Sequence, residues 1–282
     1  MNSREAYLDE LFGLEGRVAL VTGASGSIGE ALARGLAASG AKVGLLGRRA
    51  QPLEDLASSI ERDGGTAIAF PADVLDRTAL EGVRDQISIQ LGRLDILVNG
   101  AGGNLPEATL PDGGSVFELP ESAFGRVVDL NLMGTVLPTQ VFGAAMAQRE
   151  ADEPSGSIVN ISSMAADRAV TRVAGYSAAK AAVNAFTRWL AAATAHAYGD
   201  RLRVNAIAPG FFLATQNRAL LLTSEGQPTA RARAIIEHTP AGRLGDPSEL
   251  VSALIWLCGP GARFVTGAVV PVDGGFGAFS GV

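Results

Sequence analysis

The sequence places a tyrosine and a lysine four residues apart in a stretch that is expected to be helical. Tyr176 and Lys180 belong to the run YSAAK, which opens an alanine-rich segment reaching to residue 198. Residues four apart on a helix lie on the same face. A nearby ammonium favours the ionised phenol, so we expect Lys180 to lower the Tyr176 pKa from its ordinary value of about 10 and to make the phenol proton transferable.

A third polar residue gives this pair its context, because a tyrosine and a lysine at this spacing also occur on many protein surfaces. Ser163 ends the run NISS (160–163), which closes a predicted strand, and it precedes Tyr176 by thirteen residues. A loop of that length can bring both hydroxyls to one carbonyl oxygen. The three residues therefore predict acid–base chemistry at a carbonyl or an alcohol.

A glycine-rich turn follows the first predicted strand, with the sequence TGASGSIG (22–29). The helix that starts there presents free N–H groups and a partial positive charge, which suit a pyrophosphate. Glycines let the backbone approach the anion and let the helix pack closely on the strand. The spacing is Gly23, Gly26 and Gly29 rather than a literal G-x-G-x-x-G, so an ordinary glycine-rich turn remains the alternative.

Two arginines follow the second predicted strand. Arg48 and Arg49 come directly after Gly47, at the place where an NAD site usually carries an acidic residue for the ribose 2′-hydroxyl. A guanidinium group can pair with a 2′-phosphate instead. The pattern favours NADP(H) and leaves NAD(H) possible; the alternative is that both arginines are simply solvated.

Strands and helices alternate along the chain and must position these groups. Predicted strands cover 17–22, 42–46, 66–70, 94–99, 156–161, 203–207 and 268–272, and predicted helices cover 29–39, 53–62, 78–91, 124–147, 176–198 and 248–257. Uniformly apolar strands separated by helices indicate an α/β fold: a Rossmann-like, doubly wound, seven-stranded parallel sheet with helices on both faces, in a single domain over 1–282. The irregular stretch 211–245 follows a strand end, where such sheets bind ligands, and is expected to be a substrate lid.

The composition argues against several other classes of protein. Hydrophobic residues make up 47% of the 282 residues and charged residues 18%, and the net charge is −6, so we expect neither nucleic acid nor an anionic membrane surface as a partner. The longest uncharged run, 130–148, contains several polar residues and reads as a buried helix. Cys258 is the single cysteine, and His196 and His238 lie far apart, which predicts no metal site. Residues 1–15 are acidic and lack an apolar core, so a cytoplasmic enzyme without a signal peptide is expected.

Taken together, the motifs resemble the short-chain dehydrogenase/reductase family from about Leu14 onward. The resemblance rests on 22–29, Asp73, NGAG (99–102), Asn131, Ser163, YSAAK (176–180) and PG (209–210). It implies a nicotinamide cofactor, a homotetramer and a catalytic group made of Asn131, Ser163, Tyr176 and Lys180, in which Asn131 holds water for a proton relay to Lys180. The residues expected to bind the cofactor are Gly23, Ser25, Gly26, Ser27, Ile28, Gly29, Arg48, Arg49, Asp73, Val74, Asn99, Ala101, Gly102, Tyr176, Lys180, Pro209, Gly210 and Phe212.

The chain departs from the family pattern at two positions. Ser27 stands where the family commonly has glycine, and Gly100 stands where it often has a second asparagine. Neither change removes a reactive group, but both alter the detailed contacts expected around the phosphates and the adenosine.

A narrower resemblance, to the D-mannonate oxidoreductase (D-fructuronate reductase) branch, is carried by segments 101–109, 129–142, 160–182, 205–221 and 271–282. It implies interconversion of a keto sugar acid and its hydroxy acid. The residues expected to hold such a substrate are Asn104, Ser163, Arg168, Arg172, Gln216, Asn217 and Arg218. The alternatives are a reductase of another polyol, sugar acid or 3-oxoacyl compound, and a non-catalytic nicotinamide-binding regulator, which would have no need of the four catalytic residues.

Overall fold

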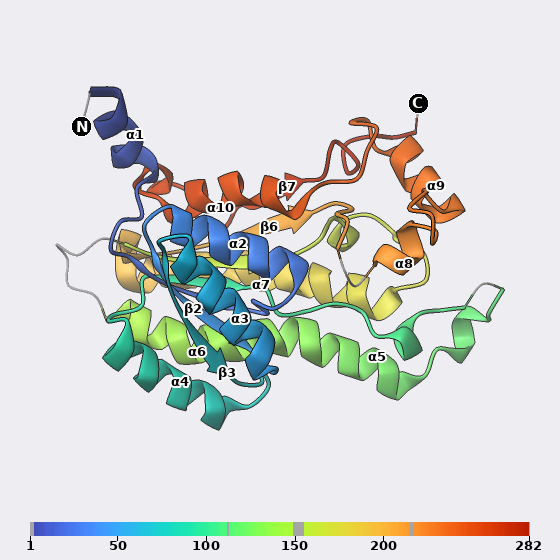
Figure 1. Ribbon diagram of the computed structural model, residues 1–282. Helices are drawn as coiled ribbons and strands as arrows, with labels where there is room; N and C mark the ends of the chain where they lie inside the picture. Colours follow the sequence, from blue (N-terminus) through green and yellow to red (C-terminus); the bar gives the residue numbers. More distant parts are fainter. Residues whose placement is uncertain (1–2, 112, 149–154, 215–216, 282) are drawn as a thin grey trace.

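A seven-stranded parallel sheet forms the centre of the molecule in the computed structural model, which describes residues 3–111, 113–148, 155–214 and 217–281 (Figure 1). The strand order is β3-β2-β1-β4-β5-β6-β7, and every neighbouring pair runs parallel. The strands are β1 (Val18–Thr22), β2 (Lys42–Gly47), β3 (Thr66–Pro71), β4 (Ile96–Asn99), β5 (Gly156–Ile161), β6 (Leu202–Pro209) and β7 (Val269–Val272). The predicted Rossmann-like, doubly wound fold is confirmed.

Helices cover both faces of this sheet (Figure 1). The helices are α1 (Ser3–Phe12), α2 (Ser27–Ala38), α3 (Ala50–Arg62), α4 (Arg77–Gln90), α5 (Glu121–Val128), α6 (Gly134–Ala147), α7 (Ala174–Tyr198), α8 (Arg218–Leu221), α9 (Ala230–His238) and α10 (Val251–Cys258). α2, α3 and α10 pack against one face, and α4, α6 and α7 against the other. No helix in the described part of the chain is both long and apolar enough to span a membrane.

The two main hydrophobic cores, one on each face of the sheet, explain why the strands lack an alternating pattern. Ala19 and Val21 of β1 point into the core beneath α2, whereas Val18 and Leu20 point into the core above α4 and α6. All five residues of β1 are buried. A strand buried on both faces gains from apolar side chains at every position, which is what the sequence shows.

The predicted helix 124–147 is present, but a π-helical segment at Asp129–Met133 joins α5 to α6. Such segments are rare and often occur at functional sites. Asn131 lies within it and is fully buried. The interruption therefore falls at the asparagine that the sequence had singled out.

Three helices were not predicted, and each lacks the signal of an amphipathic core helix. α1 buries none of its residues. α8 has four residues, and α9 has nine, of which Ala232 and Ile235 are buried. Together with Leu221, these two form a small core of their own beyond the ends of the strands, packed against Phe211 and Leu213.

The close packing of the first turn predicts a strong asymmetry between two helical glycines. A Cβ atom at Gly29 would overlap the carbonyl oxygen of Gly23, whereas a Cβ at Gly82 in α4 would meet nothing within 4 Å. Gly29→Ala should lower the free energy of unfolding by at least about 2 kcal/mol through this overlap. Gly82→Ala should raise it by about 0.5–1 kcal/mol because alanine favours the helix. Urea unfolding measures both, and equal effects of the two substitutions would contradict the packing described.

Candidate active site

A cleft of about 760 Å³ lies at the carboxyl ends of the strands. The strand order reverses between β1 and β4, and open α/β sheets bind their ligands at such a point. Most of the residues singled out from the sequence line this cleft: Gly23, Ser25, Gly26, Ser27, Ile28, Gly29, Arg48, Arg49, Asp73, Val74, Ala101, Gly102, Asn104, Ser163, Tyr176, Lys180, Pro209, Gly210, Phe212 and Asn217.

The turn between β1 and α2 forms one end of the cleft. Gly23 has a φ of 69°, a conformation that glycine adopts readily, and a Cβ there would lie 2.8 Å from the backbone of Ala101. The hydroxyl of Thr22 accepts hydrogen bonds from the amides of Gly100 and Ala101, both at 3.1 Å, and so ties the turn to the end of β4. Gly26 caps α2 without a side-chain hydrogen bond, so the first amides of the helix face the cleft. This bare, close-packed helix start fits a pyrophosphate group.

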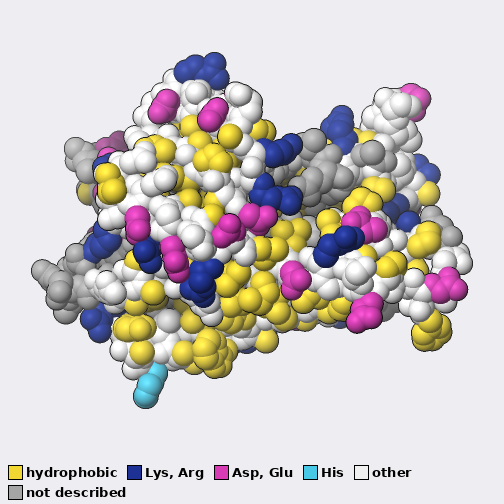
Figure 2. All heavy atoms as spheres, turned by 90° about the horizontal axis from the view of Figure 1, so that it is seen from below, with side chains coloured by type: hydrophobic (Ala, Val, Ile, Leu, Met, Phe, Trp, Pro, Cys, Tyr) yellow, Lys and Arg dark blue, Asp and Glu magenta, His cyan; other side chains and the backbone are white. Residues whose placement is uncertain are grey.

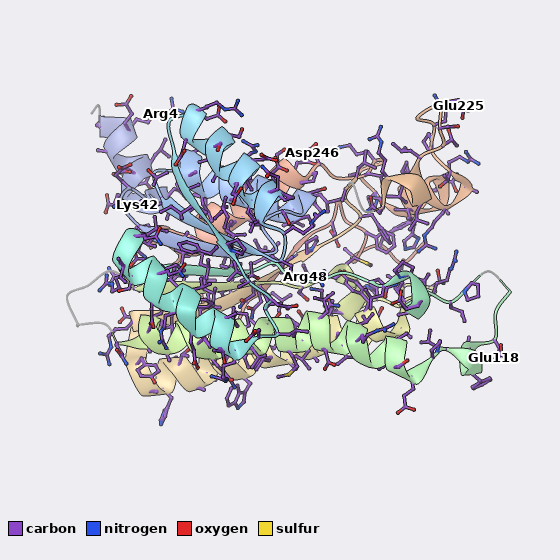
Figure 3. All side chains as sticks on the ribbon, turned by 60° about the horizontal axis from the view of Figure 1, so that its bottom comes forward. Arg4, Lys42, Arg48, Glu118, Glu225 and Asp246 are labelled. Atoms are coloured by element: carbon purple, nitrogen blue, oxygen red, sulfur yellow. The ribbon has the colours of Figure 1, made fainter. Side chains whose placement is uncertain are left out.

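The arginines after β2 lie at the same end. Arg48 and Arg49 are exposed and line the cleft, and Figure 3 shows Arg48 at the opposite end of β2 from Lys42. Asp73 and Val74 lie beside them at the end of β3. A Cβ at Gly47 would make ordinary van der Waals contacts with Leu53 at 3.5 Å and Ser25 at 3.6 Å, so a side chain beside the arginines meets no clash at its Cβ. This end of the cleft fits the adenosine half of a dinucleotide, with positive charge where a 2′-phosphate would lie.

The candidate catalytic group comes from β5 and α7. Ser163 follows β5, and its hydroxyl accepts a hydrogen bond from the Ala165 amide at 3.1 Å while its side chain also bonds to Tyr176. Lys180 lies one turn further along α7, with its Nζ 5.6 Å from the centre of the Tyr176 ring. The structure thus brings together the three residues that the sequence placed in one site.

The protonation of this group differs from the sequence-based expectation. Burial raises the pKa of the Tyr176 phenol, and the hydrogen bond with Ser163 opposes that rise. The Lys180 ammonium lies over the face of the Tyr176 ring and donates to the carbonyl of Ile161 at 2.7 Å. Burial lowers the pKa of Lys180 to about 8. The Tyr176 pKa is therefore raised and not lowered in this structure, contrary to the expectation, because burial of the phenolate is the largest effect.

Two predicted asparagines lie behind the wall of the cleft. Asn131 accepts a hydrogen bond from the Gly103 amide at 3.0 Å and donates to the carbonyls of Gly103 and Val127, both at 2.8 Å. Asn99 is buried, and its amide donates to Thr139 and Asn160. Asn99 was expected to contact the cofactor, but its side chain faces the protein interior and supports the floor of the cleft instead. A Cβ at Gly102 would approach both Asn131 and Lys180, which places these two side chains next to one another.

The expected substrate residues divide into two groups. Asn104 and Asn217 line the cleft, although the side-chain amide of Asn217 accepts a hydrogen bond from the Ala214 amide and donates one to the carbonyl of Phe212. Arg168 donates to the carbonyl of Gly277 and Arg172 to that of Leu110, so neither faces the cleft. Arg218 begins α8 and is exposed outside the cleft, which corrects the expectation for these three arginines. Gln216 lies outside the described residues.

Several residues on this side of the cleft were not predicted from the sequence. Val170, Val173 and Phe211 contribute apolar walls, and Arg231 of α9 contributes a cation. Arg231 lies in a helix that no apolar pattern had indicated, so nothing in the sequence separated it from the surface arginines around it. Among the described residues, no cluster of three or more metal-ligating side chains is present.

Comparisons with known proteins agree with this geometry. A family model described as enoyl-(acyl carrier protein) reductase matches residues 23–277. The uncharacterized oxidoreductase UxuB of Bacillus subtilis is 45% identical over 278 residues, covering 95% of this chain and 98% of the relative. A crystal structure of a provisionally assigned D-mannonate oxidoreductase from Haemophilus influenzae with bound NAD superposes with a TM-score of 0.88 at 41% identity, covering 98% of this chain and all of that one. A gluconate 5-dehydrogenase from Burkholderia cenocepacia, crystallised with NADP and tartrate, gives a TM-score of 0.84 at 31% identity, covering 96% and 98% of the two chains.

The buried lysine predicts a pH-dependent change in stability. In the unfolded chain Lys180 keeps its proton up to about pH 10.5, but in the folded protein it loses the proton at about pH 8. Between these values the unfolded state binds more protons than the folded state. The buried ammonium therefore destabilises the folded protein fully below pH 8, and this destabilisation decreases as the pH rises above 8. Lys180→Met should therefore gain stability relative to wild type by about 2 kcal/mol more at pH 7 than at pH 10.

Urea unfolding at the two pH values measures this difference, and any pH-independent effect of losing the Ile161 hydrogen bond cancels. The matched control is Lys42→Met, at the exposed start of β2 (Figure 3). A stability difference for Lys180→Met that is the same at both pH values would show that the ammonium is not buried as described.

Proposed function

The chain belongs to the short-chain dehydrogenase/reductase family of NAD(P)-dependent oxidoreductases, and we propose that it interconverts a keto sugar acid and its hydroxy acid. The proposed pair is D-fructuronate and D-mannonate, and the proposed preferred cofactor is NADP(H). The observation that carries this proposal is the group Ser163, Tyr176 and Lys180 at the carboxyl end of the sheet, with a helix start suited to pyrophosphate in the same cleft. The likeness to the provisionally assigned D-mannonate oxidoreductase supports the choice of substrate.

The cofactor supplies or accepts a hydride at the carbon of the reacting group when it is bound. In the reducing direction, the residues of this chain have to hold the ketone and deliver one proton to its oxygen as the carbon receives the hydride. The Ser163 hydroxyl donates a hydrogen bond to that oxygen, and the Tyr176 phenol gives up its proton to it. The electron pair of the C=O π bond becomes a lone pair on oxygen, which the proton then occupies. Positioned proton transfer of this kind contributes about 10²- to 10⁴-fold in rate.

Lys180 and Asn131 support the phenol in different ways. The Lys180 ammonium, fixed on the Ile161 carbonyl, lies on the ring face and keeps positive charge near the phenolate that forms. Asn131 holds the Gly103 backbone through two hydrogen bonds, is itself held by a third to the carbonyl of Val127, and lies beside Lys180. We propose that it retains water for a proton relay towards Lys180, as the family resemblance implies, from a position behind the cleft wall.

The segment 211–245 is proposed to act as a lid over the substrate. It carries Phe211, Phe212, Asn217 and Arg231 into the cleft wall and contains α8 and α9, which lie together beyond the ends of the strands (Figure 1). A parallel bridge between Phe212 and Gly245 closes the base of the segment. A lid hinged at that base can exclude water from the proton transfer.

A homotetramer is the proposed assembly. The face covered by α4 to α7 shows a broad area of hydrophobic side chains among the charged ones (Figure 2). Trp189 on α7 is 65% exposed and stacks on Phe186, with ring centroids 6.1 Å apart. Large exposed apolar areas of this kind mark protein–protein contacts.

A second candidate function is the oxidation or reduction of another sugar acid, such as gluconate. The likeness to gluconate 5-dehydrogenase favours it, and Ser163, Tyr176 and Lys180 of this chain would serve that reaction in the same way. Steady-state rates with D-fructuronate and with 5-keto-D-gluconate separate the two, since the preferred substrate has the higher kcat/KM.

Removal of the phenol hydroxyl tests the role of Tyr176 directly. Tyr176→Phe should lower kcat for D-fructuronate reduction at least about 100-fold while leaving cofactor binding within about threefold. Tyr198→Phe, a change at a surface tyrosine at the end of α7, is the control and should leave kcat unchanged. A loss of less than tenfold for Tyr176→Phe corresponds to less than about 1.4 kcal/mol of barrier and would remove the phenol from the proposed mechanism.

Cofactor preference is predicted to follow the charge at the end of β2. Replacing Arg48 and Arg49 together by alanine should raise the KM for NADPH by about 10- to 100-fold and change that for NADH little, because hydrogen bonds to charged groups are worth about 1.5–3 kcal/mol. Gly47→Asp should reverse the preference, since a Cβ there meets no clash and a carboxylate at this place is able to bind a ribose 2′-hydroxyl. Arg84→Ala on the surface of α4 is the control, and equal effects on both cofactors would contradict the NADP(H) assignment.

A further inference from the structure

The cleft has one cation on its substrate side that neither the proposed catalytic group nor the proposed phosphate contacts account for. Arg231 lies in α9 and lines the cleft together with Phe211, Ala214 and Asn217. It is half-buried, and within the described part of the chain it has no hydrogen-bond or ion-pair partner. A guanidinium group left without a partner in a cleft wall is suited to a carboxylate, which it can bind with two parallel hydrogen bonds.

Helical geometry explains why Arg231 faces the cleft and its neighbour does not. Ile235 follows Arg231 by four residues and lies on the same face, and it is buried in the small core under α9. Arg233 lies on the opposite face, is exposed, and donates to the carbonyl of Pro228 at 2.6 Å. The two arginines therefore share a helix but differ in what they can reach.

Both ends of α9 are anchored, so the start of the Arg231 side chain has a fixed position. The Thr229 hydroxyl caps the helix by accepting from the Ala232 amide at 3.2 Å, and it donates to the carbonyl of Leu220 at 2.8 Å. At the other end His238 packs on the ring of Phe276, with centroids 4.7 Å apart. A cation held on a fixed helix discriminates between ligands better than one on a free loop.

The distribution of charged residues in the cleft lining makes Arg231 the candidate to bind a carboxylate on the substrate side. Among the described residues that line the cleft, Asp73 is the one carboxylate, and it lies at the adenosine end with Arg48 and Arg49. On the substrate side Lys180 is committed to the Ile161 carbonyl, and Val170 and Val173 are apolar. An anion entering this side therefore meets no negative group from the described lining and one cation without a partner.

We propose that Arg231 binds the carboxylate of the substrate and makes the enzyme selective for keto acids over neutral ketones and polyols. This inference rests on the proposed reduction of a keto acid in the same cleft. It transfers to Arg231 the role that the sequence had suggested for Arg168, Arg172 or Arg218, whose guanidinium groups lie outside the cleft lining.

The experiment compares an acid with its uncharged counterpart in matched variants. The variants are Arg231→Gln, Arg231→Lys and, as the control on the outer face of the same helix, Arg233→Gln. Each is assayed with D-fructuronate and with its methyl ester. Arg231→Gln should raise the KM for D-fructuronate about 10- to 100-fold and leave kcat/KM for the ester within about threefold. Arg231→Lys should fall between wild type and Arg231→Gln, and Arg233→Gln should match wild type. Equal losses on the acid and the ester would overturn the proposal, and so would a rise confined to the KM of the cofactor.

A binding measurement separates failure of this inference from failure of the proposed function. D-mannonate and D-mannitol are titrated calorimetrically into wild type and Arg231→Gln in the presence of NADPH, with which neither compound can undergo hydride transfer. Selective binding of mannonate by wild type that is lost in Arg231→Gln supports the carboxylate site even if D-fructuronate is not turned over. Mannonate bound equally well by both proteins overturns the site even if the enzyme reduces D-fructuronate.

Discussion

The site depends on one buried hydrogen bond, from the Lys180 ammonium to the carbonyl of Ile161 at 2.7 Å. That carbonyl ends β5, so the bond fixes α7 relative to the edge of the sheet where the cleft opens. Lys180 is buried, and the same burial that lowers its pKa to about 8 also places Tyr176 in surroundings that raise the pKa of its phenol. The protein on its own therefore holds a protonated phenol beside a lysine whose charge is destabilised, which is an arrangement suited to donating a proton.

The parallel sheet is what makes this arrangement possible from residues far apart in the sequence. Strands that run in one direction place all their carboxyl ends at one edge, so the turn after β1, the arginines after β2 and Ser163 after β5 meet in a single cleft. A layer of buried amides lies beneath them. Asn99 bridges Thr139 and Asn160, and Asn131 holds the backbone at Gly103. These bonds keep the loops that border the cleft in place without using groups that face a ligand.

The sequence allowed much of this to be predicted, for reasons that are visible in particular residues. Val18–Thr22 is buried on both faces, so its apolar sequence indicated a central strand. The placement of Tyr176 and Lys180 on one face of a helix was predicted correctly because helix geometry is local. The direction of the Tyr176 pKa could not be read in the same way, since it depends on how much water the fold removes from the phenol. The sequence also could not show which arginine lines the substrate side of the cleft. Arg168 and Arg172 donate hydrogen bonds to backbone carbonyls, whereas Arg231 faces the cleft. Arg231 lies in α9, a helix that buries few residues and therefore leaves little apolar pattern in the sequence.

The most direct measurement of the central claim is the ionisation of Tyr176, followed by ultraviolet difference absorbance as the pH is raised. The chain has three tyrosines, so subtracting the titration of a variant that lacks the Tyr176 hydroxyl isolates the one signal of interest. Without added cofactor the Tyr176 phenol should ionise above its ordinary pKa of 10.0 because of its burial. Addition of the oxidised cofactor, whose nicotinamide ring is positively charged, should lower the midpoint, since a cation beside the phenol favours the phenolate. A Tyr176 midpoint at or below the ordinary value in the protein alone, unchanged by the cofactor, would contradict a buried proton donor in a dinucleotide cleft.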